Sequence, residues 1–200
     1  MNEAYGLRAL QQENIHLKEE NRELSEQLFQ LRHAIRGLNL LNQNLEEITP
    51  KTDVHEMING ILLVALQAVG AEEGSLILLD EETQELVFVD AVGQYREQLV
   101  GTRMPAGQGI AGTVMAQHMP VLVEDVRQEP QWYGQVDELL GFETQSILGV
   151  PVIDKGRVLG AIELVNKRDG SIFDEEDQDI LVLVARLAAM TLVRAEEMTA

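Results

Sequence analysis

The sequence predicts an α+β domain preceded by a long N-terminal coiled-coil helix. Leucine recurs at every seventh position in the first fifty residues, which is typical of a coiled coil. In the remaining 150 residues, helix-type apolar patterns at both ends flank several strand-type patterns. This order of elements indicates an antiparallel sheet with its terminal helices packed on one face. The inserted elements are expected to form the opposite wall of a pocket.

The heptad repeat predicts two parallel strands over residues 1–50. Leucine fills the d positions, and the a positions hold leucine, isoleucine and three asparagines. A buried asparagine can pair with its counterpart in a parallel dimer, whereas other registers leave the amide unpaired. We therefore expect a parallel homodimer; the alternative is one long amphipathic helix folded on its own domain. The predicted seam comprises Leu10, Asn14, Leu17, Asn21, Leu24, Leu28, Leu31, Ile35, Leu38, Asn42 and Leu45.

Composition restricts the classes of partner. The formal net charge is −19, and there is no basic cluster to bind nucleic acid or an anionic membrane. The chain has no cysteine, which excludes disulfides, thiol catalysis and cysteine-ligated metal. The N-terminus does not resemble a signal peptide, and no apolar run reaches the roughly eighteen residues of a membrane span. We expect a cytoplasmic protein that binds neither nucleic acid nor membrane, and we assign no metal site.

Residues 52–200 are predicted to form one domain that opens with a helix and two paired strands. The helix is expected over residues 54–69, because the apolar side chains there fall on one face. Residues 75–79 are uniformly apolar, which predicts a strand in the centre of the sheet. Its expected neighbour covers residues 86–92, after a polar turn.

The middle of the domain is predicted to be more irregular. Residues 104–118 begin as a glycine-rich turn and open into a helix, and residues 121–123 follow as a short strand. Residues 125–140 are polar and aromatic and are expected to form a loop with a helical turn or two. Within this loop, Trp132 and Tyr133 are expected to serve as a lid or a packing anchor.

A hairpin and a long helix complete the predicted domain. Strands are expected over residues 145–153 and 158–165, joined by a tight turn. Acidic residues from Asp174 onward cap a final helix that runs to about Glu197. The helix is apolar nearly all round over residues 180–193, so two of its sides must be covered. We expect the sheet to cover one side and the partner's copy of this helix to cover the other.

Five short motifs indicate a known family. They are Gly107-Gln-Gly-Ile-Ala-Gly112, Val123-Glu-Asp-Val126, Gly141-Phe-Glu-Thr144, Leu148-Gly-Val-Pro-Val152 and Gly160-Ala-Ile-Glu-Leu-Val-Asn-Lys167. In content and order they are similar to the motifs of the GAF domain, a small-molecule-sensing module of cyclic-nucleotide phosphodiesterases and bacterial regulators. The resemblance covers residues 52–198. It implies a six-stranded antiparallel sheet with helices on both faces, and N- and C-terminal helices that form a dimer face.

A further signature resembles that of the cyclic-nucleotide-binding members of the family. Asn166, Lys167, Phe173 and Asp177 match it, but Gln178 stands where the family has a glutamate. We expect a structural role for this set. An ion pair between Lys167 and Asp177 would fasten the loop after the last strand to the final helix.

The resemblance also implies a site for cyclic AMP or cyclic GMP. Ser75 and Asp90 would face the purine edge, and the backbone N–H groups of Ile110 and Ala111 would meet the cyclic phosphate. Val89 stands where some members stack an aromatic ring on the base. Further wall positions near the ribose and base are Asp137, Thr144 and Glu163.

Plainer interpretations of these residues stay open. The glycine run can be an ordinary turn, and Asp90, Asp137 and Glu163 can be solvated carboxylates.

The function expected from these features is that of a dimeric regulatory protein. A small ligand, with a cyclic nucleotide as the first candidate, would bind the domain. The change would pass through the terminal helices to a separate effector protein. The alternative is a ligand-free adaptor that mediates dimerisation and protein–protein contacts. No set of nucleophile, base and orienting group is present in the pattern, so we do not expect an enzyme.

Overall fold

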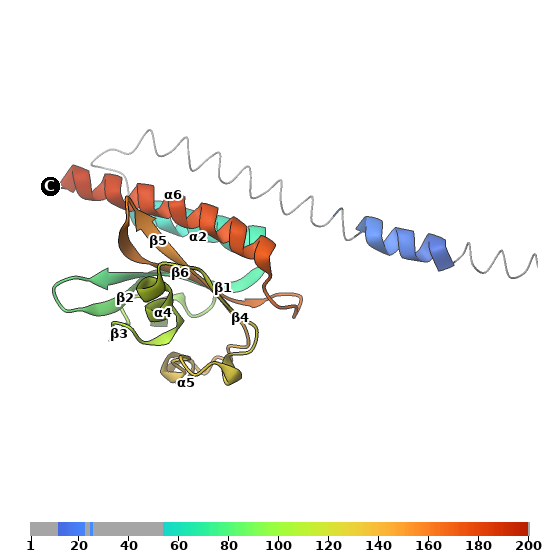
Figure 1. Cartoon of the computed structure of the whole chain (residues 1–200), viewed down its shortest axis with the longest axis horizontal. Coiled ribbons are helices and arrows are strands. Elements are labelled where there is room, and N and C mark those ends of the chain that lie inside the picture. Colours follow the sequence, from blue (N-terminus) through green and yellow to red (C-terminus); the bar gives the residue numbers. More distant parts are fainter. Residues whose placement is uncertain (1–11, 23–24, 26–53, 200) are drawn as a thin grey trace, which may run out of the picture.

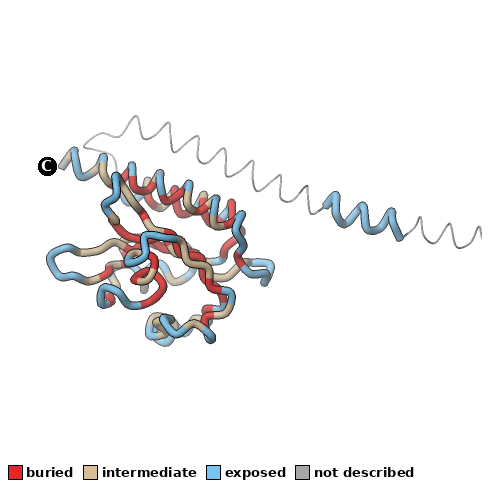
Figure 2. Tube along the Cα trace, viewed as in Figure 1, coloured by how far each residue is buried: buried red, intermediate tan, exposed pale blue. Residues whose placement is uncertain are grey.

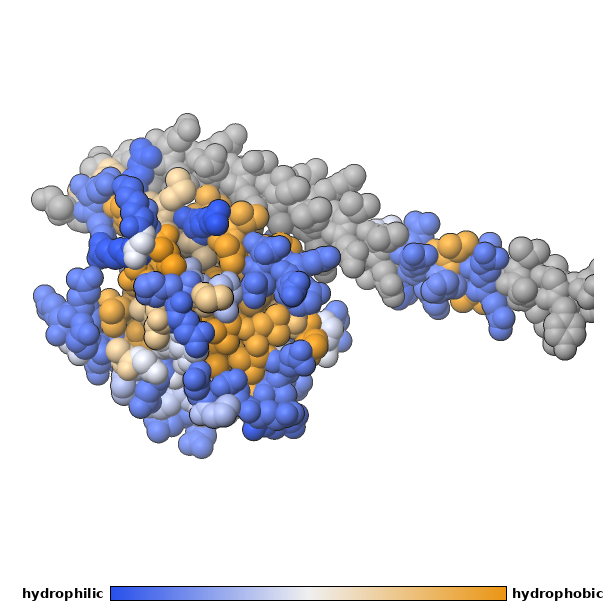
Figure 3. Space-filling view, viewed as in Figure 1, coloured by the Kyte–Doolittle hydropathy of each residue, from blue (hydrophilic) through white to orange (hydrophobic). Residues whose placement is uncertain are grey.

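The computed structural model describes residues 12–22, 25 and 54–199. Residues 12–22 are helical, and they include Asn14, Leu17 and Asn21 of the predicted seam. Leu17 is 52% exposed on the single chain. Figure 3 shows hydrophobic residues on this segment among hydrophilic ones. The other seam positions lie outside the described residues, so the coiled coil stays a prediction.

The domain is built on a six-stranded antiparallel sheet with the strand order β3-β2-β1-β6-β5-β4. This confirms the sheet that the resemblance implied. The two central strands, β1 and β6, are neighbours although they lie at opposite ends of the strand sequence. The strands are β1 (Ala71–Asp80), β2 (Glu85–Val92), β3 (Arg103–Pro105), β4 (Val121–Val123), β5 (Ile147–Asp154) and β6 (Arg157–Lys167).

Two terminal helices cover one face of the sheet. The helices α2 (Val54–Val69) and α6 (Glu175–Thr199) pack beside each other there, as Figure 1 shows. Figure 2 shows buried positions recurring along both helices. Side chains of α2, α6, β1, β5 and β6 form a common core with Phe173, which is 1% exposed. None of the helices in the described part of the chain is long and apolar enough to cross a membrane.

The inserted elements cover the opposite face. They are α3 (Arg96–Leu99), α4 (Gly109–Gln117), the short helix η1 (Val126–Gln128) and α5 (Gln135–Leu140). A second core lies between α4 and the sheet. Successive residues of a strand point to opposite faces, so Leu76 enters the helix-side core and Ile77 the second core. This explains why residues 76–79 of β1 are all apolar.

The structure corrects two details of the predicted elements. Strand β3 was not predicted, because three residues including Arg103 and Pro105 carry too little pattern to mark an edge strand. Strand β1 begins at Ala71, four residues before the predicted start at Ser75. Two glutamates at positions 72 and 73 interrupt the apolar run and hide this first part of the strand.

Candidate ligand-binding cavity

A cavity lies between the second face of the sheet and the inserted elements. Its free volume is about 70 Å³. Sites for drug-sized ligands occupy roughly 300–1,000 Å³, so a nucleotide requires the walls to move apart. The lining residues come from strands β1, β2, β3, β5 and β6, the start of α4 and the segments around α3 and α5.

The start of α4 forms one end of this cavity. The first helical residue, Gly109, has a positive φ of 70°, and the preceding Gln108 provides no side-chain cap. A Cβ on Gly112 would lie 2.4 Å from the carbonyl carbon of Gly107, so the glycine turn packs directly on the first helical turn. Gly109 and Ile110 line the cavity. The glycine run therefore brings helical backbone to the cavity wall.

Glu163 is the central carboxyl of the cavity. It lies on β6 between Ser75 of β1 and Gly149 of β5, its partners in the strand register. Gly149 has no side chain, and a Cβ there would lie 2.9 Å from Val114 of α4. Burial raises the pKa of Glu163 to about 7, and the backbone N–H of Ala111 acts in the opposite direction. Glu163 is therefore a carboxyl that changes charge near neutral pH.

Two further carboxylates line the cavity and hold its loops. Glu73 accepts a hydrogen bond of 3.0 Å from the Gln94 N–H, just before α3, and burial raises the pKa of Glu73. Asp137 of α5 accepts two hydrogen bonds from Thr144, one from its backbone N–H at 2.7 Å and one from its hydroxyl at 2.8 Å. This pair closes the turn that follows α5.

The structure brings together five of the seven residues that the resemblance assigned to ligand. Those lining the cavity are Ser75, Ile110, Asp137, Thr144 and Glu163. Ala111 does not line it, although its N–H acts on Glu163 there.

Asp90 lies elsewhere, on the sheet face covered by α2 and α6. The pairing of β1 with β2 shifts by one residue between Leu76 and Ile77, so Asp90 stands opposite Leu76, which faces the helices. Asp90 is 0% exposed, and its Oδ1 accepts a 3.1 Å hydrogen bond from Arg96 Nε. Val89 packs against the same helix-side core. Asp90 therefore does not line the cavity, unlike the other strand residues assigned to the ligand, and its role toward a ligand stays a prediction.

Aromatic residues are the part of the cavity that the sequence-based site lacked. Five of them line it: Phe88, Tyr95, Trp132, Tyr133 and Phe142. The rings of Tyr95 and Phe142 meet edge to face, with centroids 5.3 Å apart, and so join the α3 segment to the turn after α5. The concentration of rings in the irregular segment was visible in the sequence. Their convergence depends on loop geometry, which has no periodic pattern.

The Asn-Lys-Phe-Asp signature fastens the far end of β6. Asn166 accepts hydrogen bonds from the backbone N–H groups of Gln145 and Ser146 and donates one to the Glu143 carbonyl. Lys167 Nζ lies 2.8 Å from Asp177 Oδ2. Phe173, between them in the chain, fills the helix-side core.

None of these four signature residues lines the cavity. Their contacts instead fix the segment around Thr144, which lines the cavity, and the loop that follows β6.

The described residues thus form an α+β module with a cavity between the sheet and its inserted elements. The family model of the GAF domain matches residues 51–193. The chain therefore belongs to the GAF domain family, whose members are small-molecule-sensing and signalling modules.

Comparisons with known proteins agree with this assignment. A probable 3',5'-cyclic phosphodiesterase pde-5 of Caenorhabditis elegans is 26% identical over 145 residues. The match covers 68% of this chain and 20% of the relative, so the chain spans about a fifth of that protein's length.

Solved structures show the same fold. The GAF domain of a phosphoenolpyruvate-protein phosphotransferase from Coxiella burnetii has a TM-score of 0.72 at 22% identity, covering 84% of this chain and 97% of the other. The free methionine-R-sulfoxide reductase of Neisseria meningitidis, solved in complex with its substrate, has a TM-score of 0.66 at 22% identity. That match covers 82% of this chain and 90% of the reductase. At these identities the likeness shows the fold alone.

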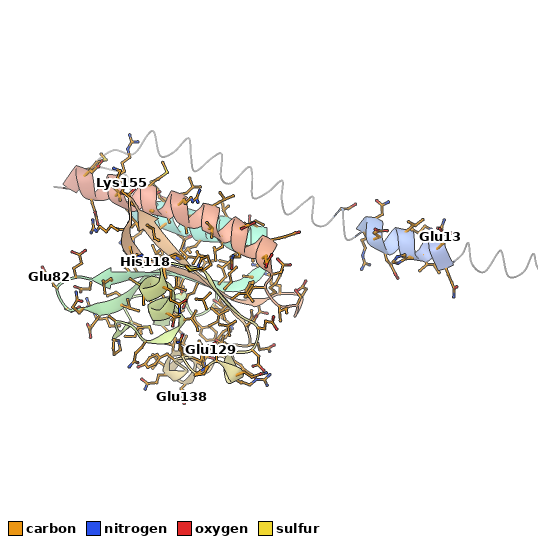
Figure 4. All side chains as sticks on the ribbon, in the orientation of Figure 1. Glu13, Glu82, His118, Glu129, Glu138 and Lys155 are labelled. Carbon is orange, nitrogen blue, oxygen red and sulfur yellow. The ribbon has the colours of Figure 1, made fainter. Side chains whose placement is uncertain are left out.

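The raised pKa of Glu163 predicts a pH-dependent stability. The folded protein holds this proton up to about pH 7, whereas the unfolded chain releases it near the ordinary value of 4.5. The free energy of unfolding should therefore fall as pH rises from 5 to 8, by about 2 kcal/mol from this group. The Glu163→Gln variant, measured by urea denaturation, should not show this fall in the free energy of unfolding between pH 5 and pH 8. The matched control Glu82→Gln, in an exposed turn (Figure 4), should behave as the wild type. Equal pH slopes for wild type and Glu163→Gln would contradict the prediction.

The ion pair between Lys167 and Asp177 predicts a large loss of stability when one partner is removed. Lys167→Met leaves the Asp177 carboxyl, whose side chain is 9% exposed, without its cation. We expect the free energy of unfolding to fall by about 3 kcal/mol, measured by urea denaturation. Adding Asp177→Asn removes the unpaired charge and should recover part of the loss. An unchanged midpoint for Lys167→Met would show that the pair contributes little.

Proposed function

We propose that this domain is a regulatory sensor whose cavity binds a cyclic nucleotide. The observation that carries the proposal is the composition of the cavity. Five aromatic residues line it together with Ser75 and Glu163, which pair across β1 and β6, and with the first turn of α4. The similarity to a probable cyclic phosphodiesterase supports the same class of ligand.

The groups in the cavity match the parts of such a ligand. A purine stacks favourably on aromatic side chains, with about 1–3 kcal/mol per base in other proteins. Its N–H groups can donate to the Ser75 hydroxyl or to a carboxyl oxygen. The cyclic phosphate would meet the backbone N–H groups at the start of α4, where the helix dipole favours negative charge.

The segment around α3 offers a route from the cavity to the terminal helices. Tyr95 and Leu99 line the cavity, and Arg96 between them pairs with the buried Asp90 on the other side of the sheet. Arg96 also lies beside His55 and other residues of the first turns of α2, around a surface depression. A ligand that displaces Tyr95 would therefore disturb a contact close to α2.

The terminal helices that respond to ligand binding would belong to a homodimer. Three large apolar residues of the terminal helices remain exposed on the single chain: Leu63 of α2 (42%), and Leu183 (49%) and Met190 (52%) of α6. Together with the heptad repeat, they support a parallel dimer that joins the helices of two chains and passes the change to a separate effector protein.

The small volume of the cavity favours a second candidate function. With about 70 Å³ free, the observed conformation holds no space for a nucleotide. A domain that keeps this conformation would act as a ligand-free adaptor for dimerisation and protein–protein contacts.

Trp132 provides a direct test of ligand binding, since it is the only tryptophan of the chain and lines the cavity. Cyclic GMP or cyclic AMP should change its fluorescence with saturation. At a concentration of 100 times Kd, the ligand should raise the free energy of unfolding by about 2.7 kcal/mol. Trp132→Phe should keep the thermal stabilisation and lose the fluorescence signal. If neither nucleotide produces either effect, the adaptor is the better account.

The dimer is tested separately by sedimentation. The wild type should sediment as a dimer at micromolar concentration. Leu24→Lys with Leu31→Lys places charges in the predicted seam and should weaken dimerisation by at least tenfold, because a buried lysine needs a partner that the seam lacks. Leu139→Lys, at a 69% exposed position of α5, is the control. An unaltered dimer in the seam variant would assign dimerisation to the terminal helices.

A further inference from the structure

Glu163 lies beside the start of α4, where the proposed anionic ligand would be bound. The backbone N–H of Ala111, in the first turn of α4, acts on the Glu163 carboxyl. This is the helix start at which a ligand phosphate would be bound. Glu163 is anchored on a central strand between Ser75 and Gly149, so its backbone cannot move away without disrupting the sheet. An ionised Glu163 would therefore stand next to a bound anion.

The remaining charged groups of the cavity do not relieve this repulsion. No lysine, arginine or histidine lines the cavity within the described ranges. The carboxylates that share it are Glu73 of β1 and Asp137 of α5, and the titratable hydroxyls are those of Tyr95 and Tyr133. Glu73 is bonded to Gln94 and Asp137 to Thr144. Without a cation to neutralise Glu163, a proton from solvent is the available counter-charge.

We propose that Glu163 is the specificity-determining residue of this cavity, which admits an anionic ligand only when the Glu163 carboxyl is protonated. The inference rests on the proposed binding of a cyclic nucleotide. Below pH 7 the carboxyl already holds its proton; above pH 7 one proton passes from solvent to the Glu163 carboxyl as the phosphodiester enters, and no covalent bond of the ligand changes. The ligand's phosphodiester stays ionised, so the protein supplies the whole pH dependence.

The position of Glu163 makes this dependence fall in a physiological range. Burial raises the pKa of the Glu163 carboxyl to about 7 in the empty cavity. A neighbouring anion raises it further, because a like charge disfavours the ionised form. The protonated fraction of the empty protein falls about tenfold between pH 6 and pH 8, and ligand affinity falls with it.

Isothermal titration calorimetry with cyclic GMP and cyclic AMP at pH 6 and pH 8 tests the inference. The wild type should bind about tenfold more tightly at pH 6, with net proton uptake at pH 8 seen as a heat that depends on the buffer. Glu163→Gln mimics the protonated carboxyl, so its affinity at pH 8 should equal its affinity at pH 6. Glu138→Gln removes a charge from an exposed position on α5 outside the lining (Figure 4) and should keep the wild-type pH dependence.

The possible failures can be told apart. Equal wild-type affinity at both pH values would overturn the role of Glu163 and leave cyclic-nucleotide binding intact. If Glu163→Gln fails to bind at both pH values while the wild type binds, the carboxylate itself is a ligand contact. That result would also overturn the proposed role of Glu163. Absence of binding by all three proteins at both pH values would overturn the proposed function, and this inference with it.

Discussion

The pairing of β1 with β6 is the constraint on which the rest of the structure depends. These two strands are separated by most of the domain in sequence, yet they form the centre of the sheet. Leu76 and Ile162 pair across them and face the terminal helices, whereas Ile77 and Ala161 pair on the opposite face. The register of this one strand pair therefore decides which residues enter each core. A slip of β6 by one residue would exchange the side chains of its two faces and bury Glu163 among the helices.

The carboxylates of this acidic chain have different roles, which depend on the groups around them. Asp137 and Asp177 each accept a backbone N–H and a side-chain donor, so each closes a local turn. Asp90 holds Arg96 from inside the sheet. Glu163 has no cation beside it in the described cavity lining, and desolvation therefore decides its charge. A net charge of −19 is thus compatible with specific structural roles for buried acids.

The sequence predicted the parts of this architecture that repeat along the chain. Bounds for α2 and β4 match the structure, because periodic or bounded apolar patterns report burial directly. Asp90 could not be placed in the same way. Its face depends on a one-residue irregularity opposite Leu76 that alternation does not reveal. Trp132 and Tyr133 were expected as a lid or packing anchor and do line the cavity, but the meeting of Tyr95 with Phe142 was missed, since it joins two irregular segments whose paths no periodic pattern fixes.

The closed cavity and its anchored walls together explain how binding could reach the helices. Under the proposed function, entry of a nucleotide must separate elements that now meet through Tyr95 and Phe142. The Phe142 side is held by the Asp137–Thr144 bonds and, beyond them, by Asn166. The α3 side is held by Glu73 and Arg96, and Arg96 extends to the face that carries α2. Glu73 and Asn166 lie on the central strands β1 and β6, which cannot yield without breaking the sheet, so the segments between the strands must move instead. Displacement of α3 is therefore the change that the terminal helices would sense, and coupling requires only that α2 pack differently when Arg96 moves.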